Sequence, residues 1–138
     1  MAIVGYNFSK VKAEKKASAK GKINISNTVK ITDVKESDLK LDNTRKGLKI
    51  EVEFISNYEP DVGTIALVGE VLLIEESKKA DEIFKSWKEK KILPKDETAA
   101  ILNVALTKSN VQALILSQLI TLPPPVQLPK VKVEEPKK

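Results

Sequence analysis

The feature that most constrains the fold is a stretch near the C-terminus, residues 95–120, that contains neither glycine nor proline. As one α-helix it would be about 40 Å long, at roughly 1.5 Å per residue. Apolar residues occupy two of its sides, one with Ile101, Leu102, Ala105, Leu116 and Leu119 and the other with Ala100, Val104, Val111, Leu114 and Ile115. A helix packed only on its own sheet needs a single apolar stripe. Two apolar sides therefore predict two partners, the chain's own sheet and a second subunit.

We accordingly predict a homo-oligomer, either a dimer or a tetramer. Its expected interface residues are Leu102, Ala105, Val111, Leu114, Ile115 and Leu119. Polar residues 107–110 interrupt both apolar sides midway. They fit either a break that sets register in a subunit interface or a turn between two shorter helices.

The first half of the chain has the period-two alternation of half-buried strands. Residues 23–31 place isoleucine and valine on odd positions, and residues 48–54 repeat the pattern on even positions. Residues 64–74 are apolar on both faces, which predicts a central strand covered on both sides. Near the N-terminus, residues 3–13 alternate less cleanly and indicate a β-bulge. Four antiparallel strands in a meander are the simplest arrangement.

The second half changes to a helical period. Ala80, Ile83, Phe84 and Trp87 recur at steps of three and four, which predicts a short helix with one apolar stripe. Pro94 stands at the start of the long helix. The predicted fold is thus α+β: a four-stranded antiparallel sheet packed by a short and a long C-terminal helix, in an oligomer. We expect one domain over residues 1–122 and a Pro-rich extended segment over residues 123–138.

The positive charge is concentrated near the N-terminus. The chain carries a formal net charge of +5, and residues 9–22 hold six lysines against one glutamate. This basic patch consists of Lys10, Lys12, Lys15, Lys16, Lys20 and Lys22. It is either a solvated strand or loop surface or a surface for phosphate or acidic partners. Arg45 is the chain's one arginine, which argues against nucleic acid, because base and phosphate readers favour the arginine fork.

The chain has no histidine and no cysteine. Their absence removes Ser-His-Asp and Cys-His catalytic arrangements, thiolate nucleophiles and most zinc sites. The five glycines match no phosphate-binding fingerprint. We therefore expect no enzyme, no catalytic residues, no metal and no cofactor. No run approaches the roughly 18 uninterrupted apolar residues of a membrane span, and the N-terminus lacks the zones of a signal peptide, so we expect a cytoplasmic protein.

Five of the seven prolines follow Leu122. The segment cannot be helical there, because proline lacks the amide hydrogen. Apolar side chains nevertheless continue among the prolines at Leu122, Val126 and Leu128. Such a tail is either a disordered terminus or a segment that lies in, or lines, an apolar groove.

The order of these elements resembles the SecB family of export chaperones. The stretch ALVGEV (66–71) resembles that family's strand ending in Cys-Glu-Val, and LPPPVQLPKV (122–131) resembles its Pro-bearing apolar extension. The resemblance, as to a divergent, archaeal-type member, implies a holdase for unfolded or nascent polypeptides with a role in protein export. SecB proteins are acidic, however, and the basic charge of this chain argues against the export motor as a partner.

From these observations we predict an oligomeric holdase that binds unfolded chains through aliphatic grooves. The expected client-binding residues are Leu122, Val126 and Leu128, with Phe84 and Trp87 near them or in the core. Two alternatives stay open. One is a structural or assembly subunit whose apolar helix faces are consumed by assembly, and the other is a binder of nucleic acid or the ribosome surface through the lysine-rich segment.

Overall fold

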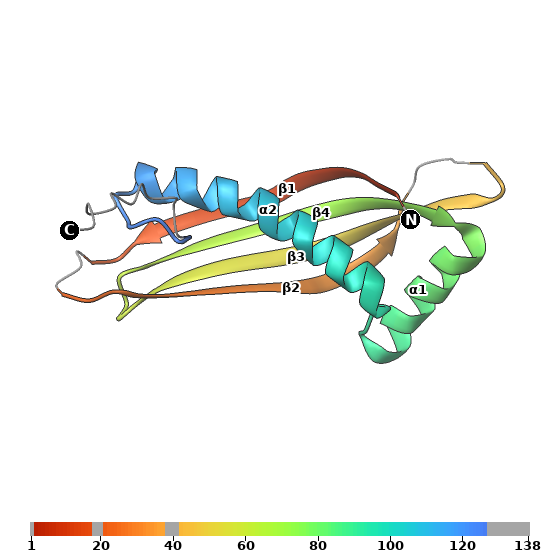
Figure 1. Ribbon diagram of the computed structural model, residues 1–138, viewed down its shortest axis with the longest axis horizontal. Coiled ribbons are helices and arrows are strands. Elements are labelled where there is room, and N and C mark those ends of the chain that lie inside the picture. Colours follow the sequence, from red (N-terminus) through yellow and green to blue (C-terminus); the bar gives the residue numbers. More distant parts are fainter. Residues whose placement is uncertain (1, 18–20, 38–41, 127–138) are drawn as a thin grey trace, which may run out of the picture.

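The computed structural model describes residues 2–17, 21–37 and 42–126. Four strands come first: β1 (Ala2–Lys15), β2 (Asn24–Glu36), β3 (Arg45–Glu59) and β4 (Gly63–Glu76). Two helices follow, α1 (Ser77–Lys90) and α2 (Lys95–Leu119). All paired strands are antiparallel, and α2 crosses one face of the sheet (Figure 1). The predicted α+β fold, with four strands, a short helix and a long helix, is confirmed.

The strand order differs from the predicted meander. The sheet runs β1-β4-β3-β2, so β2 to β4 form a meander while β1 lies beside β4. The chain after β1 therefore crosses the end of two strands to reach β2, and the backbone amides of Lys16 and Ala17 donate to the carbonyl of Val62 as it passes. Three strand spacings are about 14 Å, and the eight residues 16–23 reach about 26 Å. The connection is thus long enough for a crossover.

The two faces of the sheet differ in burial. Leu48, Ile50, Val52 and Phe54 of β3 face the helices and are at most 1% exposed, as their alternation predicted. The bulge predicted in β1 is confirmed by register shifts at Ile3/Gly5 and Phe8/Lys10. Strand β4 was expected to be covered on both sides, but only its odd-numbered residues are buried under the helices. Its even-numbered residues, such as Leu72, stay half-exposed because both helices lie on one face (Figure 1).

The core divides into two clusters along α2. The first joins β3, β4, α1 and the N-terminal half of α2, and includes Ile83, Trp87 and Ile101. The second joins the other end of the sheet to the C-terminal half of α2, and includes Tyr58, Ala113 and Leu122. Residues 107–110 do not form a turn between two helices, because α2 is continuous through them.

By length and composition, α2 is the one described helix long and apolar enough to cross a membrane, with a mean hydropathy of 1.3. Polar residues and a single charged one, Lys108, interrupt the apolar run after Glu97, so α2 passes this test although no run of 18 apolar residues exists. Core helices of other proteins pass the same test. One side of α2 does lie in the core of its own chain.

Candidate functional site

Helix α2 turns its small residues toward the sheet. From Ala105 onward its fully buried positions are Ala105, Ser109, Ala113 and Ser117, spaced every four residues. Small side chains let a helix lie close to the strands below it, and the hydroxyl of Ser117 is satisfied by the carbonyl of Leu114 at 2.7 Å. The large aliphatic residues of α2 therefore lie at its flanks and on its outer surface.

The outer surface carries a line of aliphatic side chains that the chain itself does not cover. Val111, Ile115 and Leu119 are 55%, 53% and 76% exposed and follow one another at steps of four. Residues four apart lie on one face of a helix. We name these three residues the aliphatic ridge. It is flanked by half-buried Leu114 and Leu116, and it is available to another polypeptide or another apolar surface.

The residues predicted for a subunit interface differ in exposure. Val111, Ile115 and Leu119 form the exposed ridge. Leu114 is half-buried beside the ridge, and Leu102 is half-buried nearer the start of the helix. Ala105 is fully buried in the first core cluster. That part of the prediction is wrong, because the inner surface of α2, and not its outer one, is built from small residues. The other five residues stay a prediction.

The start of the Pro-rich segment is held against the sheet by two hydrogen bonds, and a third orients one of their donors. The Tyr58 hydroxyl donates to the carbonyl of Pro123 at 2.6 Å, and Asn27 Nδ2 donates to that of Pro125 at 2.8 Å. The Ser56 hydroxyl fixes the Asn27 amide by donating to its Oδ1 at 2.6 Å. We name Asn27, Ser56 and Tyr58 the tail clamp. Burial raises the pKa of Tyr58 to about 12, so its hydroxyl stays protonated and able to donate.

The predicted client-binding residues are not equally accessible. Leu122 and Trp87 are buried in the two core clusters, at 6% and 7% exposure, and are not available to a client. Val126 is half-buried beyond the tail clamp, and Phe84 is half-buried on α1. Leu128 lies outside the described residues. Val126 and Phe84 thus remain candidates. The ridge, whose residues were predicted to make subunit contacts, exposes more apolar surface than these two half-buried side chains do.

The predicted basic patch is spread out along β1 and the crossover. Lys10 and Lys12 lie on the sheet face opposite the helices, paired across the strands with Val68 and Ala66. Lys15 donates to the Thr121 carbonyl at 3.2 Å. Lys16 forms an ion pair with Asp61 at 3.2 Å. Lys22 is exposed, and Lys20 lies outside the described residues. Part of this charge is therefore used within the chain.

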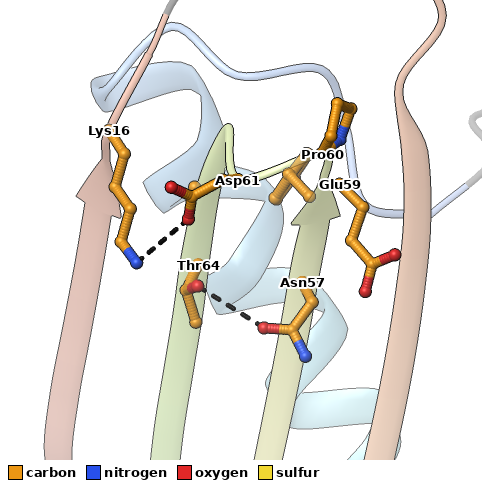
Figure 2. Close-up of a pocket in the computed structure, with 8 residues that line it drawn as sticks. Lys16, Asn57, Glu59, Pro60, Asp61 and Thr64 are labelled. Carbon is orange, nitrogen blue, oxygen red and sulfur yellow. Dashed lines mark hydrogen bonds and ion pairs between the residues drawn. The ribbon is translucent and has the colours of Figure 1, made fainter.

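A polar hollow of about 400 Å³ lies where the crossover passes the β3–β4 turn. Figure 2 shows it from the side on which α2 lies behind the strands, with Lys16 and Asp61 paired across it and Thr64 Oγ1 3.4 Å from Asn57 Oδ1. Most of its lining side chains are polar, so it does not suit an apolar client. Within the described residues no group of three or more acidic, histidine or cysteine side chains could hold a metal ion.

The chain is similar to known proteins in structure and not in sequence. No protein-family model matches the sequence. No curated protein matches it either. Among solved structures, the SecB-like chaperone Rv1957 of Mycobacterium tuberculosis, in complex with a ChAD peptide from the Rv1956 HigA1 antitoxin, is similar to this chain with a TM-score of 0.52. The two are 13% identical, and the match covers 97% of this chain and 92% of that one. The likeness extends over nearly the whole of both chains, and this chain has the SecB-like fold.

Proposed function

We propose that this protein is a SecB-like chaperone of the holdase type, which assembles into an oligomer and binds unfolded polypeptides on aliphatic surface. The observation that carries the proposal is the aliphatic ridge, Val111, Ile115 and Leu119, exposed on the long helix of a SecB-like fold. The similar chaperone was solved with a peptide bound, which supports polypeptide as the ligand class. The proposed mechanism involves no chemical reaction.

Covering apolar surface gains about 25 cal/mol per Å², so a patch of a few hundred Å² holds an unfolded chain only weakly. Several patches on one oligomer, engaged by one long client, raise the overall affinity through effective concentration. Apolar burial has no direction, so such binding tolerates many client sequences. A role in export and a cytoplasmic location stay predictions from the sequence.

The test dilutes an unfolded protein into buffer and follows its aggregation by light scattering. We expect this protein, at near-stoichiometric amounts, to suppress aggregation and to have the mass of an oligomer. The variant Val111→Ser/Ile115→Ser should lower both the mass and the suppression, because it removes exposed apolar area without touching the core. A protein that is a monomer and does not affect aggregation would contradict the proposal.

The matched control is Val4→Ser/Val11→Ser on β1. These valines are 53% and 52% exposed, so the two variants remove aliphatic side chains of equal exposure. We expect the control to keep its mass and most of its suppression. An equal loss in both variants would show that the ridge has no special part in holding clients.

A second function is favoured by the same ridge. If a second copy covers it completely, the protein is an assembly subunit, and its aliphatic surface serves self-association alone. The wild-type protein would then be an oligomer that leaves the aggregation of the test protein unchanged. The two measurements in one experiment therefore separate the holdase from the subunit.

A further inference from the structure

A strongly basic corner lies where α1 ends and the chain turns into α2. Between Phe84 and Lys95, five lysines stand against one carboxylate, Glu89, which gives a formal charge of +4 within twelve residues. All five lysine side chains are exposed: Lys85, Lys88, Lys90, Lys91 and Lys95. The corner is distinct from the basic patch predicted near the N-terminus, which lies on β1 and the crossover.

The corner lysines differ from two lysines that bind the carboxylates of the helices. Lys46 of β3 is paired with Asp81 of α1 at 2.7 Å, and Lys79 of α1 with Glu97 of α2 at 2.8 Å. Over residues 2–17, 21–37 and 42–126, no carboxylate lies within ion-pair distance of any of the five corner lysines. Their charge is therefore available to an external partner.

The helix dipole accounts for only part of this arrangement. Lysines in the last turn of a helix interact favourably with its C-terminal carbonyls, which explains Lys88 and Lys90 on α1. Lys95 is the first residue of α2, where the dipole disfavours a cation. Lys91 follows the helix in the left-handed region, with φ 56°. The concentration of charge around the turn thus exceeds what helix stability requires.

Apolar surface is placed among these cations. Lys88 Nζ lies 4.5 Å from the centroid of the Phe84 ring, and Lys91 Nζ lies 5.3 Å from that of Trp87. Both contacts hold an ammonium group at a defined place on an aromatic face. Ile92 is 60% exposed, and its carbonyl accepts from the Ser86 hydroxyl at 2.8 Å, which fixes the turn against α1. The corner therefore offers cations and an aliphatic side chain in a fixed arrangement.

We propose that this corner is a docking surface for acidic polypeptide segments in which aspartate or glutamate neighbours aliphatic residues. The lysines attract the acidic side chains of such a segment through charge complementarity. Ile92 and the edge of Phe84 contact its aliphatic side chains. Lysine rather than arginine provides all of the charge, which favours carboxylates in an extended chain over the bidentate recognition of bases and phosphates. The inference rests on the proposed function for its ligand class, and it adds the kind of client segment that is preferred.

The test measures the binding of two labelled peptides to the full-length protein by fluorescence anisotropy. Both peptides contain the same leucines, and they differ only in carrying glutamate or lysine beside them. We expect the glutamate peptide to bind about tenfold more tightly at low salt, and the preference to shrink as salt screens the charges. Equal affinity for the two peptides would overturn the proposal.

Two variants locate the site. Lys88→Glu/Lys91→Glu should abolish the preference for the glutamate peptide, and Lys88→Gln/Lys91→Gln should reduce it without placing acidic groups at the end of α1. The matched control, Lys10→Glu/Lys12→Glu, makes the same change of net charge on the opposite sheet face and should keep the preference. An equal loss in the control would mean that net charge alone acts, which contradicts a site at the corner.

Two further readouts complete the experiment. A labelled oligothymidylate should bind less tightly than the glutamate peptide, and tighter binding that the corner variant abolishes would overturn the proposal in favour of nucleic acid. Aggregation of a test protein should be suppressed equally by wild type and corner variant when the test protein has few acidic residues. Failure of the holdase function would appear in this last assay for both proteins, whereas failure of the corner proposal would appear in the peptide assay.

Discussion

At the scale of single residues, Gly69 shows how one missing side chain shapes the sheet. It lies on the helix-facing side of β4, and the ring of Tyr6 from neighbouring β1 occupies the space above it. A Cβ at Gly69 would come closer than 3 Å to two carbons of that ring and to its hydroxyl oxygen. Tyr6 in turn packs edge-on against Phe8, with ring centroids 5.1 Å apart. From the sequence, Gly69 stands out only as part of the ALVGEV stretch, because its contact with Tyr6 joins distant parts of the chain.

We predict that Gly69→Ala destabilises the protein by about 1–3 kcal/mol, since the added methyl group forces Tyr6 out of its position. The measurement is the free energy of unfolding in urea. Gly5→Ala is the matched control, because a Cβ there would meet only Leu72 Cβ, at an ordinary 3.9 Å. The control should be neutral or slightly stabilising. Equal stabilities for the two variants would contradict the packing of Tyr6 on Gly69.

At the scale of elements, the sequence predicted which segments are helices and strands better than it predicted how they meet. The long helix was expected over residues 95–120 and is observed as Lys95–Leu119, because Pro94 and Pro123 confine it. Alternation in β3 correctly predicted its buried face. These features depend on local periodicity, which is visible in any short window.

The errors concern long-range arrangement. Pairing of β1 with β4 is non-local, and nothing in either strand's own pattern specifies its neighbour. The side of α2 that meets the sheet was also partly misjudged, because Ala105 was placed in the subunit interface and is fully buried in the chain's own core. The usual expectation is that the larger apolar residues face the core. From Ala105 onward the small residues of this helix do so, and Leu119 is the most exposed large apolar side chain described.

An ion pair between the two helices makes a pH-dependent prediction. Glu97 at the start of α2 is 5% exposed and lies 2.8 Å from Lys79 on α1, which lowers its pKa from the ordinary 4.5. A carboxyl with a lowered folded-state pKa contributes stability above its unfolded pKa and loses it as the pH falls through the folded value. Glu97→Gln should therefore destabilise the protein at pH 7, and the difference should shrink below about pH 4.5.

The control for this prediction is Asp81→Asn, which breaks the ion pair with Lys46 between two exposed side chains. Exposed pairs contribute little, so this variant should unfold almost like the wild type at both pH values. Thermal unfolding across the pH range measures all three proteins. A Glu97→Gln variant that is equally destabilised at pH 7 and pH 3 would show that its loss is one of packing rather than charge.

At the scale of the whole molecule, α2 connects the two proposed binding surfaces. The basic corner adjoins its N-terminus and the aliphatic ridge occupies its C-terminal half. Lys95 and Ile115 are about 30 Å apart along the helix, at roughly 1.5 Å per residue. An extended polypeptide of about nine residues spans this distance. One unfolded client can therefore place an acidic segment at the corner and an apolar one at the ridge, and two weak contacts on one chain reinforce each other.

The extent of the folded unit provides the last prediction. Leu122 packs in the second core cluster, and the tail clamp bonds the carbonyls of Pro123 and Pro125. A protein truncated after Thr121 should be less stable than one truncated after Val126. Losing the buried leucine costs about 2–5 kcal/mol, and each lost hydrogen bond about 1 kcal/mol. Because both variants lack residues 127–138, the difference in their free energies of unfolding belongs to residues 122–126 alone. Equal stabilities would mean that the folded unit ends with α2 and that the tail clamp does not contribute to the free energy of unfolding.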